Sequence, residues 1–178
     1  RRQRQMCIRD RISCNTEDTA YANSLISSPH PLASQAGKFI YSKGGNAFDA
    51  AVAAAFTLSV VEPSMSGIGG RLQVIYKQAE GGILGIDATT QIPESFKNED
   101  EELPSYGYST IGIPGVVAGL IKLHEENGVL DLKKVMEPSI TLAEDGFYLT
   151  IKEALLFQNN SSISYILFML THKYFLLI

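Results

Sequence analysis

The chain has 178 residues, of which 45% are hydrophobic and 19% charged, and its formal net charge is −4. This composition is that of a globular domain or part of one, and it excludes a chain disordered by composition and a membrane bundle. The acidic balance argues against a nucleic-acid binder, because such a protein needs a basic face to neutralise phosphates.

The two ends differ in composition from the middle. Residues 1–11 hold five arginines and no apolar run, and we interpret residues 1–21 as a non-native or disordered leader. A basic arm for an acidic partner is the alternative. Residues 161–178 are an atypical apolar tail, whose longest unbroken apolar run is far shorter than the roughly 20 residues that a bilayer span needs. We interpret this tail as frameshifted sequence, with a genuine hydrophobic terminus as the alternative, and expect no membrane span.

Residues 22–160 carry the part of the fold that the sequence predicts, and they begin with two helices. The first covers residues 32–42 and stops at two glycines, Gly44 and Gly45. Asn46 is placed to cap a second helix over residues 47–61, with Asp49 adding negative charge at its positive end. This second helix is apolar nearly all round, so we expect it to be buried, with part of its cover supplied by a later part of the protein.

A glycine-rich turn at residues 67–70 leads into a predicted strand over residues 71–76. Gly81 and Gly82 form a turn, and residues 83–86 return as a second strand. Because the glycine-rich turn precedes a strand rather than a helix, it lacks the cradle of N–H groups that binds phosphate at a helix N-terminus. We interpret it as a tight turn that brings the backbone close to a neighbouring site.

Two more helices follow an acidic loop at residues 97–102. One is predicted over residues 115–127, beginning after Pro114. The other begins at Asp131, is restarted by Pro138 and ends at Gly146. The order of helices, hairpin and helices predicts a layered α+β fold rather than a doubly wound sheet.

Few residues indicate chemistry by themselves. The histidines have no carboxylate or cysteine at ligand spacing, and Cys7 and Cys14 form neither a zinc motif nor a disulfide framework. We therefore expect no metal or cofactor. His124 follows a helical pattern beside two glutamates and is interpreted as a surface residue. A G-x-S-x-G nucleophile motif is absent from the sequence.

Five motifs occur in order and at close spacing: SPHPLAS at 28–34, GGNAFDAAVAA at 44–54, VEPSMSGIGG at 61–70, GIPGVVAG at 112–119 and EPSITLAEDGF at 137–147. As a set they closely resemble the start of the large subunit of γ-glutamyltransferases, over about residues 27–158. The resemblance implies a partial Ntn-hydrolase αββα sandwich, made as one precursor that cleaves itself to expose a threonine nucleophile.

The resemblance also implies an activity and partners. The family transfers the γ-glutamyl group of a donor such as glutathione to water or to an amino acid, without a metal or organic cofactor. The nucleophilic threonine lies in the later, small subunit, which is therefore the expected partner. No residue here matches it, so we expect the chain as written to be inactive. The resemblance implies a periplasmic or extracellular location.

The chain departs from the family at two positions. The family has Arg-Glu-x-Ala-Pro after the second strand, and the arginine grips the α-carboxylate of the donor. Here residues 89–93 read TTQIP, so Thr89 replaces that arginine, while Arg71 stands where the family commonly has a further glycine. We expect Arg71 and Thr89 to bind substrate, with the cation moved to the neighbouring strand. A surface or structural role for Arg71 is the alternative.

Two other functions remain open at this stage. One is a related Ntn amide acylase with a different acyl substrate, which the missing arginine would suit. The other is a non-catalytic scaffold product. A downstream processing threonine in the full-length gene would separate an enzyme from a scaffold.

Overall fold

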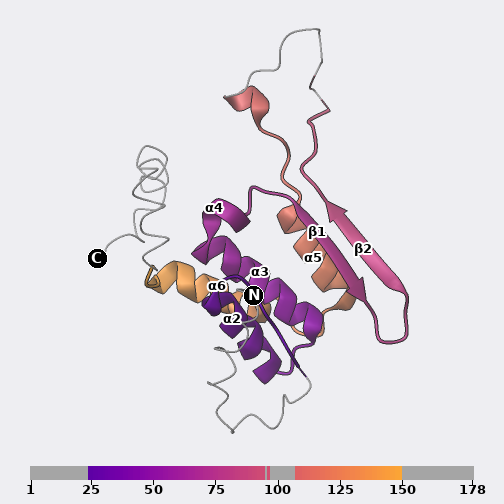
Figure 1. Cartoon of the computed structure of the whole chain (residues 1–178), viewed down its shortest axis with the longest axis vertical. Coiled ribbons are helices and arrows are strands. Elements are labelled where there is room, and N and C mark those ends of the chain that lie inside the picture. Colours follow the sequence, from indigo (N-terminus) through magenta and orange to yellow (C-terminus); the bar gives the residue numbers. More distant parts are fainter. Residues whose placement is uncertain (1–23, 95, 97–106, 150–178) are drawn as a thin grey trace, which may run out of the picture.

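The computed structural model describes residues 24–94, 96 and 107–149 (Figure 1). Its elements in chain order are α2 (Pro31–Ser42), α3 (Ala47–Val61), α4 (Pro63–Ser66), β1 (Leu72–Lys77), β2 (Ile83–Ala88), a 3₁₀ turn (Tyr108–Thr110), α5 (Val116–Asn127) and α6 (Leu132–Asp145). The predicted α+β order of helices, hairpin and helices is confirmed. The predicted leader, the predicted acidic loop at residues 97–102 and the apolar tail all lie outside the described residues.

Two capped helices form the first unit. The Nδ1 atom of His30 accepts the Leu32 N–H (3.1 Å) at the start of α2. The Asn46 side chain accepts the N–H groups of Phe48 and Asp49 at the start of α3 (2.9 and 3.0 Å). In return, Asp49 Oδ2 accepts the Asn46 N–H (3.0 Å). These reciprocal bonds confirm the cap and satisfy N–H groups that the first helical turn leaves without partners.

Helix α3 lies at the centre of the core and contacts α2, α4, α5 and α6. The buried cluster combines alanines, a valine and a phenylalanine of α3 with aliphatic residues from the elements around it: Ile40, Ala50, Val52, Ala53, Phe56, Ile86, Val116, Leu120, Leu123 and Val135. Ala51 is exposed, so α3 is not buried all round. Most of its cover comes from helices of this chain, and the alanines allow those helices to approach closely.

Strands β1 and β2 pair antiparallel, from Leu72 opposite Ala88 to Lys77 opposite Ile83. Within the described part of the chain the sheet has these two strands only. Side chains alternate along β1, so that Leu72, Val74 and Tyr76 pack against the core while the others face outward. The outer face leaves two isoleucines open, Ile75 with 83% and Ile83 with 75% of its surface exposed.

Helix α6 differs from its predicted form at Pro138. The sequence predicts that this proline restarts the helix, but α6 is continuous from Leu132 to Asp145 with Pro138 inside it. A proline removes one N–H donor, and the backbone bonds of the neighbouring turns keep the helix together. Ser139 adds a bond from its hydroxyl to the Met136 carbonyl oxygen (2.7 Å).

None of the helices among the described residues combines the length and the apolar character needed to cross a bilayer.

Candidate functional site

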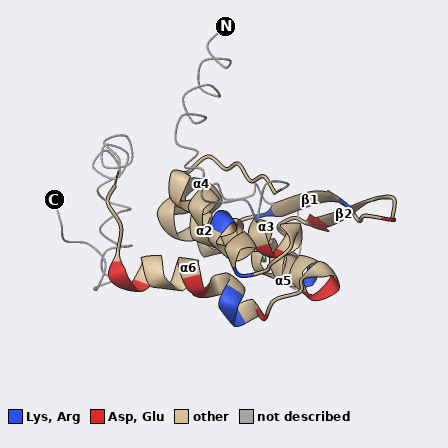
Figure 2. Ribbon diagram, turned by 90° about the horizontal axis from the view of Figure 1, so that it is seen from below, with Lys and Arg blue, Asp and Glu red and all other residues tan. Residues whose placement is uncertain are grey.

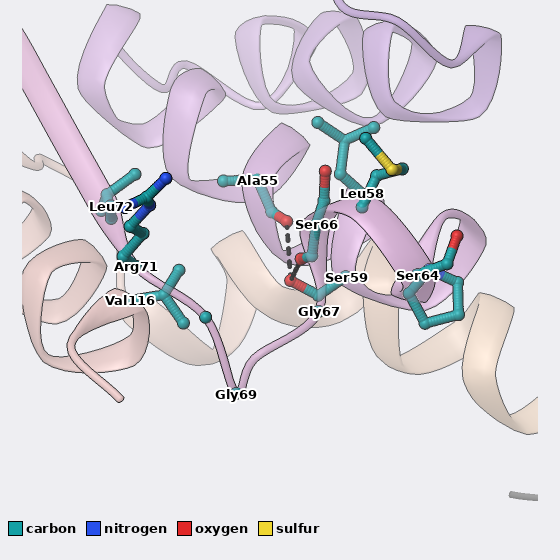
Figure 3. A pocket seen from close by; sticks show the side chains of 13 residues that line it. Ala55, Leu58, Ser59, Ser64, Ser66, Gly67, Gly69, Arg71, Leu72 and Val116 are labelled. Carbon is teal, nitrogen blue, oxygen red and sulfur yellow. Dashed lines mark hydrogen bonds between the residues drawn. The ribbon is translucent and has the colours of Figure 1, made fainter. Parts of the chain in front are cut away.

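A hollow of about 560 Å³ lies where the end of α3, α4, the glycine-rich turn and the starts of β1 and α5 meet. Figure 3 shows Arg71 and Leu72 on one side of it and Ser64 on the other, with the glycine-rich turn between. Its lining is made mostly of small and polar residues: Ala55, Leu58, Ser59, Pro63, Ser64, Met65, Ser66, Gly67, Gly69, Gly70, Arg71, Leu72 and Val116. Arg71 is the charged member of this lining.

The glycine-rich turn packs closely because its glycines have no side chains. A Cβ atom on Gly67 would lie 2.6 Å from the Pro63 carbonyl oxygen, which no real side chain allows. Gly70 donates its N–H to the Gly67 oxygen (3.2 Å). The Gly70 oxygen accepts the N–H groups of Gly115 (3.2 Å) and Val116 (3.4 Å). The turn thus runs from α4 to β1 and also fixes the beginning of α5, and it brings backbone to the wall of the hollow.

Helix α5 begins against the last residues of β2. Gly115 has no room for a Cβ atom, because the Ala88 carbonyl would collide with it. Gln91 and Ile113 exchange backbone hydrogen bonds of 3.0 and 2.8 Å. These contacts hold the segment that follows β2 close to the hollow, and Thr89 is part of this segment.

The two predicted substrate-binding residues occupy matching places at one end of the hairpin. Leu72 and Ala88 form the end pair of the register, and Arg71 and Thr89 are the next residues beyond it. Arg71 is exposed and lines the hollow, whereas Thr89 is half-buried and is not among the lining residues. Among the described residues Arg71 has no hydrogen bond or ion pair.

Thr89 is already engaged by a neighbour that the sequence reasoning missed. Its backbone N–H and its hydroxyl both donate to Oδ1 of Asp87, at 3.2 and 2.8 Å. The hydroxyl has one proton, so in this arrangement Thr89 offers a ligand its lone pairs rather than a donor. The Asp-x-Thr spacing is a signal that could have predicted this turn.

A second polar cluster lies at the opposite end of α3, and it corrects the interpretation of His124. This residue is buried, with 8% of its surface exposed. Its Nε2 atom lies 2.9 Å from the Leu130 carbonyl oxygen and 3.5 Å from Oδ1 of Asp49. The helical pattern places His124 on the core side of α5, next to a carboxylate from a distant part of the sequence. A lone aspartate in an apolar helix could have indicated such a partner, because a buried carboxylate needs hydrogen-bond donors.

No group of three metal-ligating side chains occurs in the part of the chain that the structure describes. The lining of the hollow offers serine hydroxyls, backbone groups and the guanidinium group of Arg71. A guanidinium group binds a carboxylate through two parallel hydrogen bonds, which makes the hollow suited to an anionic group of a small molecule.

The arrangement of the helices and the hairpin is that of a known class of proteins. The model of the family described as gamma-glutamyltranspeptidase matches residues 33–175. The chain belongs to this family.

Relatives of known sequence support the assignment. The chain is 35% identical over 136 residues to the glutathione hydrolase proenzyme of Bacillus subtilis (strain 168), covering 70% of this chain and 23% of that protein. It is 35% identical over 155 residues to the acylase ACY 1 proenzyme of Pseudomonas sp. (strain SE83), covering 78% of this chain and 28% of that protein. The chain therefore spans about a quarter of the length of these relatives.

The fold is also similar to a solved structure. Helicobacter pylori gamma-glutamyltranspeptidase aligns with a TM-score of 0.74 and 32% sequence identity, over 86% of this chain and 46% of that chain. The described elements are thus a part of a larger family fold.

Proposed function

We propose that this chain is the opening part of the large-subunit region of a γ-glutamyltransferase or glutathione hydrolase precursor. The observation that carries this proposal is the family match over residues 33–175, joined by the likeness to the Helicobacter pylori structure. Two of the similar proteins are proenzymes by name, which fits a protein matured from one precursor. The remainder of the precursor, including the small subunit, is the partner we propose.

The proposed reaction is acyl transfer in two steps. The carbonyl carbon of a γ-glutamyl amide, such as that of glutathione, forms an ester with the hydroxyl of a threonine in the small subunit, and the C–N bond breaks. The hydroxyl proton passes through the amine of the same threonine to the departing amine. Water or an amino-acid amine then takes the acyl group and restores the hydroxyl.

In this reaction Arg71 would bind the carboxylate of the donor. It lies in the wall of the hollow, and it carries a charge that no described residue neutralises. Thr89 would lie beside the same ligand as a small neighbour and would not donate to it, since its hydroxyl already donates to Oδ1 of Asp87. This assignment gives the guanidinium group the carboxylate role that the family gives to an arginine at the position of Thr89.

The hairpin would be part of an αββα sandwich completed by the rest of the precursor. Each described strand has one neighbour, and the outer face of the hairpin exposes Ile75 and Ile83. Further strands and a second sheet would pair these edges and cover this face. We also propose a periplasmic or extracellular location, which rests on the family resemblance.

The test uses the complete precursor that contains this segment. We expect self-cleavage and hydrolysis of a γ-glutamyl anilide. Replacing Arg71 by Met should lower kcat/KM roughly 10- to 100-fold for this donor, the loss of a charged hydrogen bond of about 1.5–3 kcal/mol. A donor lacking the α-carboxylate should be hydrolysed equally well by both forms.

A control variant separates this local effect from a general loss of charge. Lys77→Met removes a cation at the far end of β1, which is exposed and outside the hollow, so its kinetics should match those of the unchanged enzyme. An equal effect of Arg71→Met on both donors would refute the role of Arg71. Failure of the unchanged precursor to cleave itself would refute the proposed enzyme function and favour a non-catalytic scaffold protein.

A related amide acylase is the second candidate. It is favoured by the replacement of the family arginine by Thr89 and by the similarity to the acylase ACY 1 proenzyme. This candidate predicts a precursor that cleaves itself, yet hydrolyses acyl amides without an α-carboxylate faster than γ-glutamyl amides.

A further inference from the structure

We propose that Ser59 is a positioning residue, which sets the place of Arg71 in the hollow by holding the carbonyl group of Ser66. This inference rests on the proposed role of Arg71 as the carboxylate-binding residue. Ser59 lies in the wall of the hollow, but its hydroxyl proton is engaged by backbone carbonyl oxygens. It would act through the short glycine-rich segment that ends at Arg71.

Ser59 joins two elements that a proline separates. Its hydroxyl oxygen lies 3.1 Å from the Ala55 carbonyl oxygen one turn earlier and 2.8 Å from the Ser66 carbonyl oxygen, and its single proton is shared between these two acceptors, with Ser66 the closer. The first contact is common for serine in a helix. The second crosses from α3 to α4, past Pro63. Figure 3 shows Ser59 next to both Ala55 and Ser66, at the wall of the hollow.

The segment between Ser66 and Arg71 depends on its two ends. Three of its four residues are glycines, which have no side chains to hold them in place. At the far end, the Gly70 oxygen is fixed by the N–H groups of Gly115 and Val116. At the near end, the Ser66 oxygen is fixed by Ser59. Arg71 follows Gly70 directly, so the two anchors together set the path of the backbone that leads to the guanidinium group, and loss of the near anchor would leave this path held at one end only.

The alternative is a purely structural role, in which Ser59 stabilises only the last turn of α3. The two roles differ in what they affect. A structural serine would change stability and would lower activity towards all donors alike. A positioning serine would change the binding of the carboxylate, and its effect would vanish once the guanidinium group is removed.

The experiment is a double-mutant cycle in the complete precursor, with Ser59→Ala, Arg71→Met and the two combined. We expect Ser59→Ala to raise KM roughly five- to tenfold for the carboxylate-bearing donor, with little change in kcat and none for the donor without a carboxylate. In the Arg71→Met background, Ser59→Ala should cause no further loss. Ser59→Thr keeps the hydroxyl and should restore the normal KM.

Ser139→Ala is the matched control. This serine is buried, whereas Ser59 is half-buried, and like Ser59 it donates to a backbone oxygen, that of Met136, but it lies in α6 and is not among the residues that line the hollow. Its kinetics should be unchanged for both donors. If Ser59→Ala does not yield folded protein, Ser59→Cys replaces it, because a thiol has a similar size and is a weak donor.

The outcomes separate this inference from the proposed function. Arg71→Met could lower activity only towards the carboxylate-bearing donor, while Ser59→Ala lowers activity equally with and without Arg71. In that case the positioning role of Ser59 is wrong and the role of Arg71 stands. If Arg71→Met changes activity towards both donors equally, the carboxylate-binding role of Arg71 is wrong, and the positioning role of Ser59 is wrong with it.

Discussion

The carboxylate of Asp49, in the first turn of α3, lies beside the imidazole of His124 on α5, with Oδ1 and Nε2 3.5 Å apart. Asp49 is fully buried, and its carboxylate accepts the N–H groups of Asn46 (3.0 Å) and Val129 (3.2 Å to Oδ2). The Asn46 side chain in turn donates to the Asn127 oxygen (2.6 Å). One carboxylate therefore ties the beginning of α3 to the end of α5 and to the loop before α6.

Replacing Asp49 by Ala should destabilise the complete protein by about 1.5–3 kcal/mol, because hydrogen bonds to a buried charge are lost and their donors are left without partners. Urea unfolding measures the change. Asp131→Ala is the comparison: it removes an exposed helix cap that accepts one bond, from Lys133, and should cost about 1 kcal/mol. A smaller effect at Asp49 than at Asp131 would contradict the role of the cluster.

Replacing Gly128 by Ala should disturb the same cluster through crowding. The added Cβ atom would lie 2.7 Å from Oδ1 of Asp49 and 2.7 Å from the His124 oxygen. Overpacking of this kind costs about 1–3 kcal/mol, and thermal unfolding should show a lower midpoint. Gly82→Ala is the control, since a Cβ atom there meets no atom within 4 Å. Equal midpoints for the two variants would refute the prediction.

Helix α6 carries its charges in the order that the helix dipole disfavours. Lysines lie at its beginning and Glu144 and Asp145 at its end (Figure 2). Replacing Lys134 by Glu puts a negative charge in the first turn and should stabilise the protein by about 0.3–1 kcal/mol. Lys134→Gln, which only removes the positive charge, should give an intermediate value, and added salt should shrink both gains. A loss of stability with Glu would contradict the electrostatic argument.

The outer face of the hairpin should make the 178-residue chain bind a hydrophobic dye. Ile75 and Ile83 lie on this face with most of their surfaces exposed, and their replacement by Thr keeps the β-branched shape while reducing the apolar area. Dye fluorescence should fall in the double variant. Leu25→Thr, which removes an exposed leucine away from the hairpin (90% exposed), should leave the fluorescence nearly unchanged. The same fluorescence in both variants would refute a hairpin site.

Local chemistry made much of the fold predictable. Asn46, with Asp49 three residues later, marks a helix start, because the cap is formed by neighbours in the sequence. The glycine pair at 81–82 and the alternation of β1 likewise predict the hairpin, and the observed ends differ from the predicted ones by one or two residues.

Contacts between distant residues were not predictable in the same way. His124 stands beside two glutamates in the sequence, and only the packing of α5 against α3 shows that it faces Asp49, 75 positions earlier. At the candidate site, Arg71 and Thr89 are predictions that come from a departure from a family motif. The sequence did not indicate that Asp87 holds the Thr89 hydroxyl.

The short link between α2 and α3 bears on how the protein forms during synthesis. The link consists of residues 43–46. Its backbone groups form hydrogen bonds to the adjacent helical turns, such as that from the Gly45 N–H to the Ile40 carbonyl oxygen (3.0 Å). Contacts between segments so close in sequence cost little chain entropy and form early. The pair of helices can therefore assemble as soon as it leaves the ribosome, and it then offers a preformed surface to α5, α6 and the hairpin as each is made.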